Sequence, residues 1–143
     1  MISLDTNVLA RAITTEANAD AATAAQQSSA RHLLSSGQSL FVPITVIEEL
    51  EWVLRGAYEM PTLDVAAIFE DLLAVEHITV DRAAAVAQAI QWYRLGLDFS
   101  DALHLSQSGL CHGLASFDTR FSKAVHRLGL KPPVSGPGAA KGG

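Results

Sequence analysis

The sequence predicts an α/β fold with a mostly parallel central sheet of four to five short strands, covered by helices on both faces. Short apolar runs of strand length alternate along the chain with longer segments that carry apolar residues at helical spacing. Such alternation is typical of parallel sheets, because each parallel connection needs a crossover that usually contains a helix. No internal repeat or shift in composition marks a second domain. We therefore expect one domain over residues 1–134 and a flexible tail over residues 135–143.

The composition agrees with a compact globular protein. Of the 143 residues, 49% are hydrophobic and 17% are charged, which argues against disorder. The net charge of −5 gives no general attraction to polyanions, so nucleic-acid binding would need a local basic patch, a metal site or a basic partner. Cys111 is the single cysteine, nothing resembles a signal peptide, and no apolar run approaches the length of a membrane span. We expect a soluble, cytoplasmic protein without membrane association.

The first elements follow from apolar spacing and helix-breaking residues. A strand over residues 2–4 leads through a polar turn into a short helix with apolar residues between positions 8 and 13. Residues 21–34 are rich in Ala and Gln, which favour helix, and Gly37 ends this segment. Residues 40–42 form the second strand.

The middle of the chain repeats the pattern. Residues 45–55 carry apolar side chains at helical spacing. Thr62 is a suitable N-cap for a helix that extends to residue 75. Residues 77–80 form a third strand, and Asp81 is expected to cap the Ala-rich helix that follows.

The last third contains two more helices and two strands. Residues 98–101, DFSD, open a helix that we expect to extend toward residue 111. Residues 114–116 form the fourth strand. A small helix over residues 119–128 is ended by Gly129, and residues 132–134 form an edge strand.

Four acids occupy informative positions in this scheme. Asp5 follows the first strand, Asp118 follows the fourth, and both therefore lie at the carboxyl edge of a parallel sheet, where α/β proteins bind ligands. Glu49 belongs to the helix after the second strand, and Asp101 to the first turn of a helix. Carboxylates gathered in one crevice raise one another's pKa unless a cation compensates them. Oxygen ligands without a Cys or His cluster favour Mg²⁺ or Mn²⁺.

Helix capping is a second explanation for some of these acids. Asp5 and Asp118 each precede a helix and can cap it. Asp98 and Asp101, at positions i and i+3, can act as an N-cap and an acidic first-turn partner. The glutamates of the third helix, Glu48, Glu49 and Glu51, can form a solvated face. The residues alone leave both explanations open.

Four pieces of sequence together resemble a known family. They are LDTNVL, VPITVIEELEWVL, DFSDALHL and LASFDTRF, in this order over one small domain. With them, residues 2–133 resemble the PIN-domain ribonucleases, and particularly the VapC toxins of bacterial toxin–antitoxin pairs. The resemblance implies that four acids are catalytic and bind the metal: Asp5, Glu49, Asp101 and Asp118. Glu48 takes the place of Glu49 if the register shifts by one. The implied supporting residues are Thr6, Asn7, Asp98 and Ser116, the last where the family often has threonine.

The resemblance also implies an activity and partners. The activity is metal-dependent endonucleolytic hydrolysis of phosphodiester bonds in RNA (tRNA, rRNA or mRNA), with one or two Mg²⁺ or Mn²⁺ ions activating a water. The partners are a cognate antitoxin protein and a second copy of the chain in a homodimer. Helices over residues 21–34 and 62–75 can serve these contacts, although most of their apolar residues fit plain core packing. Five cations could attract the RNA: Arg11, Arg31, Arg55, Arg120 and Lys123. A cation of this kind is more often an ordinary surface charge.

Two other classes of protein fit the sequence less well. A phospho-receiver signalling domain has a similar length, a parallel sheet and an acidic magnesium pocket. However, a receiver would have an acidic pair after its first strand, where this chain has only Asp5, and it would leave Glu49 and Asp101 without roles. A nuclease-like module that only binds RNA or a partner is the other alternative. The presence of all four acids favours the nuclease.

Overall fold

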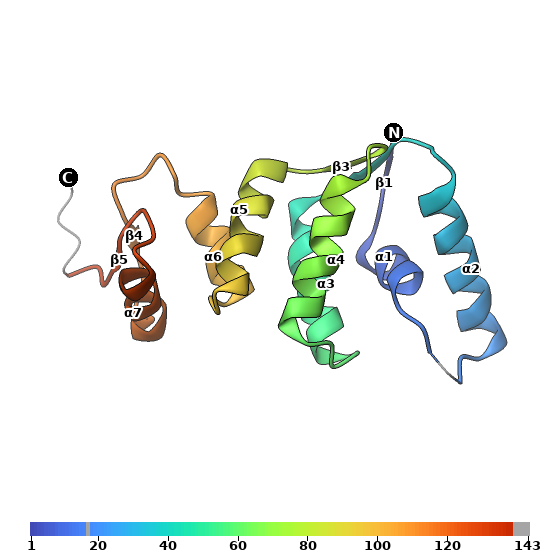
Figure 1. Cartoon of the computed structure of the whole chain (residues 1–143), viewed down its shortest axis with the longest axis horizontal. Coiled ribbons are helices and arrows are strands. Elements are labelled where there is room, and N and C mark those ends of the chain that lie inside the picture. Colours follow the sequence, from blue (N-terminus) through green and yellow to red (C-terminus); the bar gives the residue numbers. More distant parts are fainter. Residues whose placement is uncertain (17, 139–143) are drawn as a thin grey trace. The chain divides into compact units, whose positions relative to one another are not determined.

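The structure is a computed structural model that describes residues 1–16 and 18–138. Its contacts divide the chain into two compact units, Met1–Ala83 and Ala84–Gly143, which we call the N-terminal and the C-terminal unit and describe separately. Figure 1 labels the helices and most of the strands of both units. None of the described helices is long and apolar enough to cross a membrane.

The N-terminal unit contains a parallel three-stranded sheet. Strands β1 (Ile2–Ser3), β2 (Leu40–Val42) and β3 (Ile78–Val80) pair in this order, with Ile2 opposite Leu40 and Leu40 opposite Ile78. In β2 and β3 the first and third side chains are buried and the middle one is more exposed. This period of two places the buried side chains of both strands on one face of the sheet.

Four helices accompany this sheet. They are α1 (Thr6–Ile13), α2 (Ala21–Ser35), α3 (Ile44–Gly56) and α4 (Thr62–Ala74). Helix α1 packs against α2 and α3, and α4 packs against α3 and β3. Fully buried side chains from α1, α3 and α4 form most of the core; among them are Leu9, Ile47, Leu50, Leu54 and Phe69.

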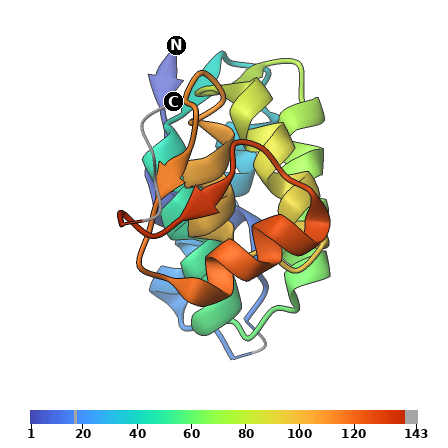
Figure 2. The ribbon, with the colours of Figure 1, turned by 90° about the vertical axis from the view of Figure 1, so that its left-hand side faces the viewer.

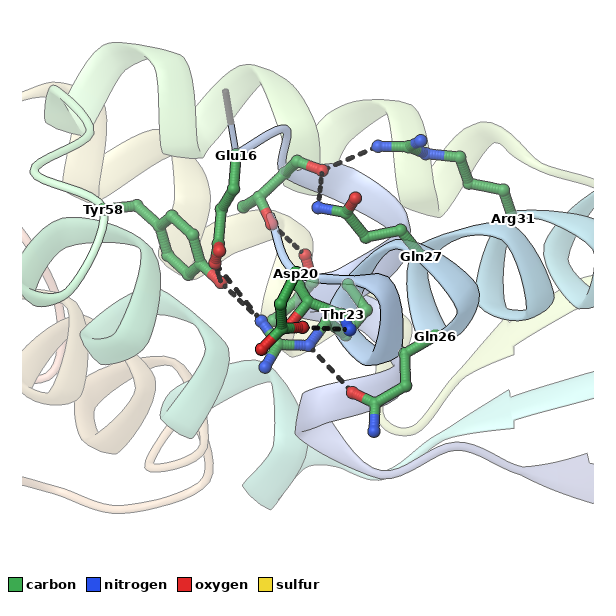
Figure 3. A network of polar contacts seen from close by, with 10 residues as sticks. Glu16, Asp20, Thr23, Gln26, Gln27, Arg31 and Tyr58 are labelled. Atoms are coloured by element: carbon green, nitrogen blue, oxygen red, sulfur yellow. Dashed lines mark hydrogen bonds and ion pairs between the residues drawn. The ribbon is translucent and has the colours of Figure 1, made fainter. Parts of the chain in front are cut away.

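Polar side chains fasten α1 to its neighbours (Figure 3). The side chains of Arg31 and Gln27 in α2 both donate to the carbonyl oxygen of Thr14, at 2.7 and 3.4 Å. Arg11 in α1 donates to the hydroxyl of Tyr58 at 3.2 Å. Carbonyl groups at a helix C-terminus lack partners within the helix, so the guanidinium group of Arg31 supplies hydrogen-bond donors to the end of α1. As a result α1, and with it the turn at its start, is held against α2 and against the chain that follows α3.

The C-terminal unit is mainly helical. It contains α5 (Ala83–Arg94, beginning at the boundary), α6 (Phe99–Ser106), β4 (Leu114–Ala115), α7 (Thr119–Leu128) and β5 (Val134–Ser135). Strands β4 and β5 pair in parallel, and α7 packs against β5 (Figure 2). The rings of Tyr93 and Phe99 meet edge to face with their centroids 5.1 Å apart. Gly129 ends α7 in the left-handed conformation, with φ of 66°.

The α/β class and the parallel pairing are confirmed, with one difference in how the strands are distributed. In the described residues the strands form a sheet of three and a separate sheet of two, whereas we expected one central sheet. Strands of two or three residues make few ladder hydrogen bonds, so apolar runs of this length do not determine which strands pair.

Several local expectations were wrong. Thr62 is the first residue of α4 and not its N-cap, because Pro61 occupies the cap position without a side-chain hydrogen bond. The carboxylate of Asp81 accepts the backbone N–H of Ile44 at 3.5 Å, at the start of α3, instead of capping α5. Helix α6 ends at Ser106, several residues before the expected end. Ser135 belongs to β5 and not to a tail, since its carbonyl accepts the N–H of Ser116. The last five residues, 139–143, lie outside the described residues.

Candidate functional site

Asp5 lies in the turn between β1 and α1. It is exposed and is the N-cap of α1, with extended backbone and with its Oδ1 accepting the N–H of Thr6 at 2.7 Å. Its Oδ2 accepts no hydrogen bond from the described residues. Capping therefore occupies one carboxylate oxygen and leaves the other available to a ligand.

The two residues after Asp5 differ in their surroundings. Thr6 is only 5% exposed, and its Oγ1 has no hydrogen-bond partner among the described residues. A buried hydroxyl without a partner costs about 1–3 kcal/mol, so it marks a place that a bound ligand or water would complete. Asn7 is exposed and lines a cavity of about 470 Å³ between α1 and α2, together with Arg11 and Gln26.

The three glutamates of α3 have three different environments. Glu51 is 5% exposed and forms an ion pair with Arg55 at 2.8 Å, so the explanation by a solvated face does not hold for Glu51. Glu48 is half-buried and has a polar partner of its own. Glu49 is exposed and makes no hydrogen bond or ion pair with the described residues. Glu49 is thus the glutamate of α3 whose carboxylate is available to a ligand.

Three aspartates of the C-terminal unit line one cavity of about 350 Å³. Asp98 is the N-cap of α6, and its Oδ2 accepts the N–H of Asp101 at 3.2 Å. Asp118 is the N-cap of α7, and its Oδ1 accepts two backbone N–H groups at 3.0 and 3.2 Å. Ser116 Oγ accepts the N–H of Asp118 at 3.0 Å and so holds the turn that presents Asp118. The loops before α6 and α7 therefore bring these carboxylates to the same cavity.

Both burial and the neighbouring acids act on the pKa of Asp101. Burial raises the pKa of Asp101 above its ordinary value, and the negative charges of Asp98 and Asp118 raise it further. His104, one turn along α6, lowers it by a smaller amount. An unpaired carboxylate in this position is costly, and a cation in the cavity would remove the cost.

Capping explains part of this acidic set. It is confirmed for Asp5, Asp98 and Asp118, each of which binds backbone N–H groups at the start of a helix. Asp101 lies inside the first turn of α6 and caps nothing, and Glu49 lies in the middle of α3. Capping and ligand binding are therefore not alternatives here, because each cap uses a single carboxylate oxygen.

The donor atoms fit a hard divalent cation. All of them are carboxylate oxygens, which Mg²⁺ and Mn²⁺ prefer, and the pKa of Asp101 is raised by burial and then by the charges of Asp98 and Asp118. Within residues 1–16 and 18–138, no three His, Cys, Asp or Glu side chains are grouped closely enough to hold a metal. Asp5 and Glu49 belong to the N-terminal unit, Asp101 and Asp118 to the C-terminal unit. Their convergence on one metal stays a prediction.

Arg120 also lines the cavity of the three aspartates. The sequence did not single out this arginine as a site residue. We had grouped it with four other cations that are more often ordinary surface charges. The available signal was its position two residues after Asp118, in the first turn of the helix that Asp118 caps.

Comparison with known proteins adds one result. The model of the PIN domain family matches residues 2–126, a segment that contains all eight residues considered for the site. No curated protein is similar enough to the chain to count as a match.

Proposed function

The chain belongs to the PIN domain family, and we propose that it is a metal-dependent endoribonuclease, the toxin of a VapC-type toxin–antitoxin pair. PIN domains are in general nucleases, so nuclease activity follows from membership of the family. The dependence on Mg²⁺ or Mn²⁺, the choice of RNA and the toxin role are our proposals.

One observation supports the proposal most strongly: Asp98, Asp101 and Asp118 line a single cavity, and the pKa of Asp101 is raised there. Burial and the neighbouring aspartates destabilise the Asp101 carboxylate. Proteins retain such arrangements where a cation is bound, and perturbed acids in a cleft favour a functional site over a structural one. Exposed Asp5 and exposed Glu49, which has no hydrogen-bond or ion-pair partner among the described residues, add two more oxygen donors in the N-terminal unit.

In this proposal the chain's own residues have distinct roles. The metal would be held by Asp5, Glu49, Asp101 and Asp118. When bound, it would lower the pKa of a water and neutralise charge on the phosphoryl oxygens of the RNA. Glu49 is suited to accept a proton from the attacking water. Asp98 and Ser116 position Asp101 and Asp118 through backbone hydrogen bonds, and Thr6 and Asn7 support Asp5.

The test is cleavage of total RNA by the purified chain, freed of any antitoxin, in Mg²⁺, Mn²⁺ or EDTA. We expect discrete fragments that require the metal. Asp5→Asn and Asp101→Asn should each reduce cleavage by roughly a hundredfold or more while the circular dichroism spectrum is unchanged. Glu76→Gln, an exposed carboxylate in a turn, serves as control and should cleave normally.

Other results of this experiment have equally definite meanings. Undiminished metal-dependent cleavage by both aspartate variants would contradict the assigned site. If the folded chain binds metal and RNA but cuts no RNA of any class, the binding-only alternative replaces the nuclease. Mapping the fragment ends would name the RNA substrate.

The proposed partners are an antitoxin and a second copy of the chain. An apolar cavity of about 370 Å³ in the N-terminal unit supports an antitoxin contact, since α2 and α4 contribute Leu34, Ile68 and Leu72 to it. Most side chains of α2 are at least partly exposed, so this helix is not a core helix. Its exposed side chains are available to contact an antitoxin. A monomeric mass by light scattering at micromolar concentration would contradict the homodimer. A toxin of this kind would act on RNA in the cytoplasm.

A further inference from the structure

Charge is divided very unevenly between the two units. Residues 1–83 contain twelve of the fifteen acids and four of the ten Lys and Arg residues, a net charge of −8. Residues 84–143 contain three acids and six Lys and Arg residues, a net charge of +3. The net charge of −5 for the whole chain therefore includes a C-terminal unit of positive net charge, to which a polyanion would be attracted.

The cations of the N-terminal unit are largely occupied by internal contacts. Arg11 donates to Gln26 at 3.1 Å and to Glu16 at 3.4 Å. Arg31 donates to two backbone carbonyl oxygens, and Arg55 is paired with Glu51. These three guanidinium groups hold helices and loops in place, so their capacity to bind a phosphate is reduced.

Helix α7 presents a different kind of cation. Arg120, Lys123 and Arg127 are exposed, and their side chains form no ion pair with the described residues. At 100° per residue they lie within an arc of about 60°, in a stripe about 10 Å long. Phe121 and Val125 occupy the buried side of the helix, which fixes the direction in which the stripe faces. We call these three residues the basic stripe.

The basic stripe begins at the acidic cavity. Arg120 lines that cavity together with Asp98, Asp101 and Asp118. Cations that adjoin an acidic site can attract a polyanion that the carboxylates alone would repel. The stripe therefore leads toward the carboxylates that the proposed reaction uses.

An exposed aromatic residue adjoins one of these carboxylates in the chain. Phe117 is 88% exposed, although it directly precedes Asp118. Hydrogen bonds of 3.0 Å hold the backbone on both sides of it, from Ser116 N–H to the carbonyl of Ser135 and from Asp118 N–H to Ser116 Oγ. A ring presented on such a fixed turn is suited to stack on an unpaired base, which is how proteins commonly bind single-stranded RNA.

We propose that the basic stripe and Phe117 form the surface that docks single-stranded RNA, with the stripe contacting phosphates and Phe117 stacking on a base next to the scissile bond. This inference rests on the proposed function. In this proposal the C-terminal unit supplies the contacts to the RNA substrate. The acidic N-terminal unit supplies no RNA contact of comparable strength.

The phosphate contacts are tested by RNA binding at several salt concentrations. The probe is a labelled single-stranded oligoadenylate, and binding is measured by fluorescence anisotropy. The double variant Lys123→Gln/Arg127→Gln should reduce the slope of log K against log[salt] by about 0.7 for each lost contact. The charge-preserving variant Lys123→Arg/Arg127→Lys should bind like the wild type. Arg82→Gln, which removes an exposed cation from the N-terminal unit, should leave the slope unchanged.

The stacking contact is tested at Phe117. Phe117→Ala should weaken oligoadenylate binding by roughly five- to a hundredfold and raise KM for cleavage more than it lowers kcat. Phe117→Tyr should restore both values, whereas Phe117→Leu, which keeps apolar bulk without a π face, should not. Leu110→Ala is the matched control, because Leu110 is an apolar residue of the same unit that is at least as exposed as Phe117.

The outcomes separate this inference from the proposed function. If the wild type cleaves RNA and the stripe and Phe117 variants bind and cleave like it, the docking surface is overturned and the nuclease stands. If the wild type neither binds nor cleaves RNA, the proposed function fails first and the docking surface with it. Unchanged RNA binding together with lost binding to polyglutamate would assign the stripe to an acidic protein partner and overturn the RNA proposal.

Discussion

Helices α1 and α7 begin in the same way and serve their units differently. Each follows a short strand and starts at an aspartate that caps it, Asp5 for α1 and Asp118 for α7. The arginine in α1, Arg11, is tied to Gln26, Glu16 and Tyr58, so α1 is built into its unit by polar contacts. In α7 the exposed cations have no such ties among the described residues.

The same local motif thus starts two helices whose cations differ in their contacts. A strand, an aspartate and a helix place a carboxylate at the helix start in both units. The other side chains of each helix then decide whether its cations are held by contacts within the unit or are exposed to solvent. The three predictions that follow test this contrast, beginning with the largest expected effect.

The first prediction concerns the acid that the N-terminal unit contributes from α3. Glu49→Gln should lower the rate of metal-dependent RNA cleavage by roughly a hundredfold, because an exposed carboxylate without a partner is removed from the proposed site. Glu48→Gln changes the neighbouring glutamate by the same chemistry and should retain most of the activity. Loss of activity in Glu48→Gln alone would shift the register of the site by one residue.

The second prediction compares an engaged cation with a free one. Arg31→Met removes the donors to the carbonyl groups of Ala12 and Thr14 and should lower the free energy of unfolding by about 1–2 kcal/mol. Lys123→Met removes a cation of α7 that has no ion pair with the described residues and should change it by less than about 0.5 kcal/mol. Urea denaturation in EDTA measures both values. Equal losses would contradict the contrast between the two units.

The third prediction concerns pH and has the smallest expected effect. Because burial, and then Asp98 and Asp118, raise the pKa of Asp101 in the folded state, the folded protein binds its proton more tightly than the unfolded chain does. Without metal, the contribution of Asp101 to the free energy of unfolding should therefore be fully present below the ordinary pKa of an aspartate and should be lost as the pH rises through the raised pKa. Asp101→Asn should not show this decline.

A matched variant isolates the charge of Asp98 in that experiment. Asp98→Asn keeps an effective N-cap for α6 but removes a negative charge. It should lower the pKa of Asp101 toward its ordinary value, as measured by NMR titration of the side chain. An unchanged pKa would show that the charge of Asp98 has no part in the shift and would leave burial and Asp118 as its causes.

The elements themselves could be predicted well from the sequence. Residues 40–42 and 119–128 have the bounds that we expected for a strand and a helix, and Asp118 and Gly129 mark the start and end of α7 as expected. These signals are local. A capping side chain binds backbone N–H groups within three residues, and a glycine with positive φ ends a helix through its own backbone conformation. Asp101 was also recognisable as a site candidate, because its position in a helix first turn followed from the DFSD segment.

The environment of each side chain could not be predicted in this way. Glu49 and Glu51 lie two residues apart in one helix, yet one is exposed and the other is buried against Arg55. Likewise, sequence did not distinguish Arg31, whose donors are occupied, from Arg120, which faces an acidic cavity. Helical spacing says which residues share a face, but not what packs against that face.

The α/β class, the order of the elements and the aspartate caps of α1, α6 and α7 follow from the sequence, because each depends on residues close together in the chain or on their order along it. The tertiary structure alone decided which strands pair, which glutamate is buried, which cations are free and which aspartates raise the pKa of Asp101. These features depend on distances between segments that are remote in sequence, and electrostatic and packing energies fall off steeply over such distances.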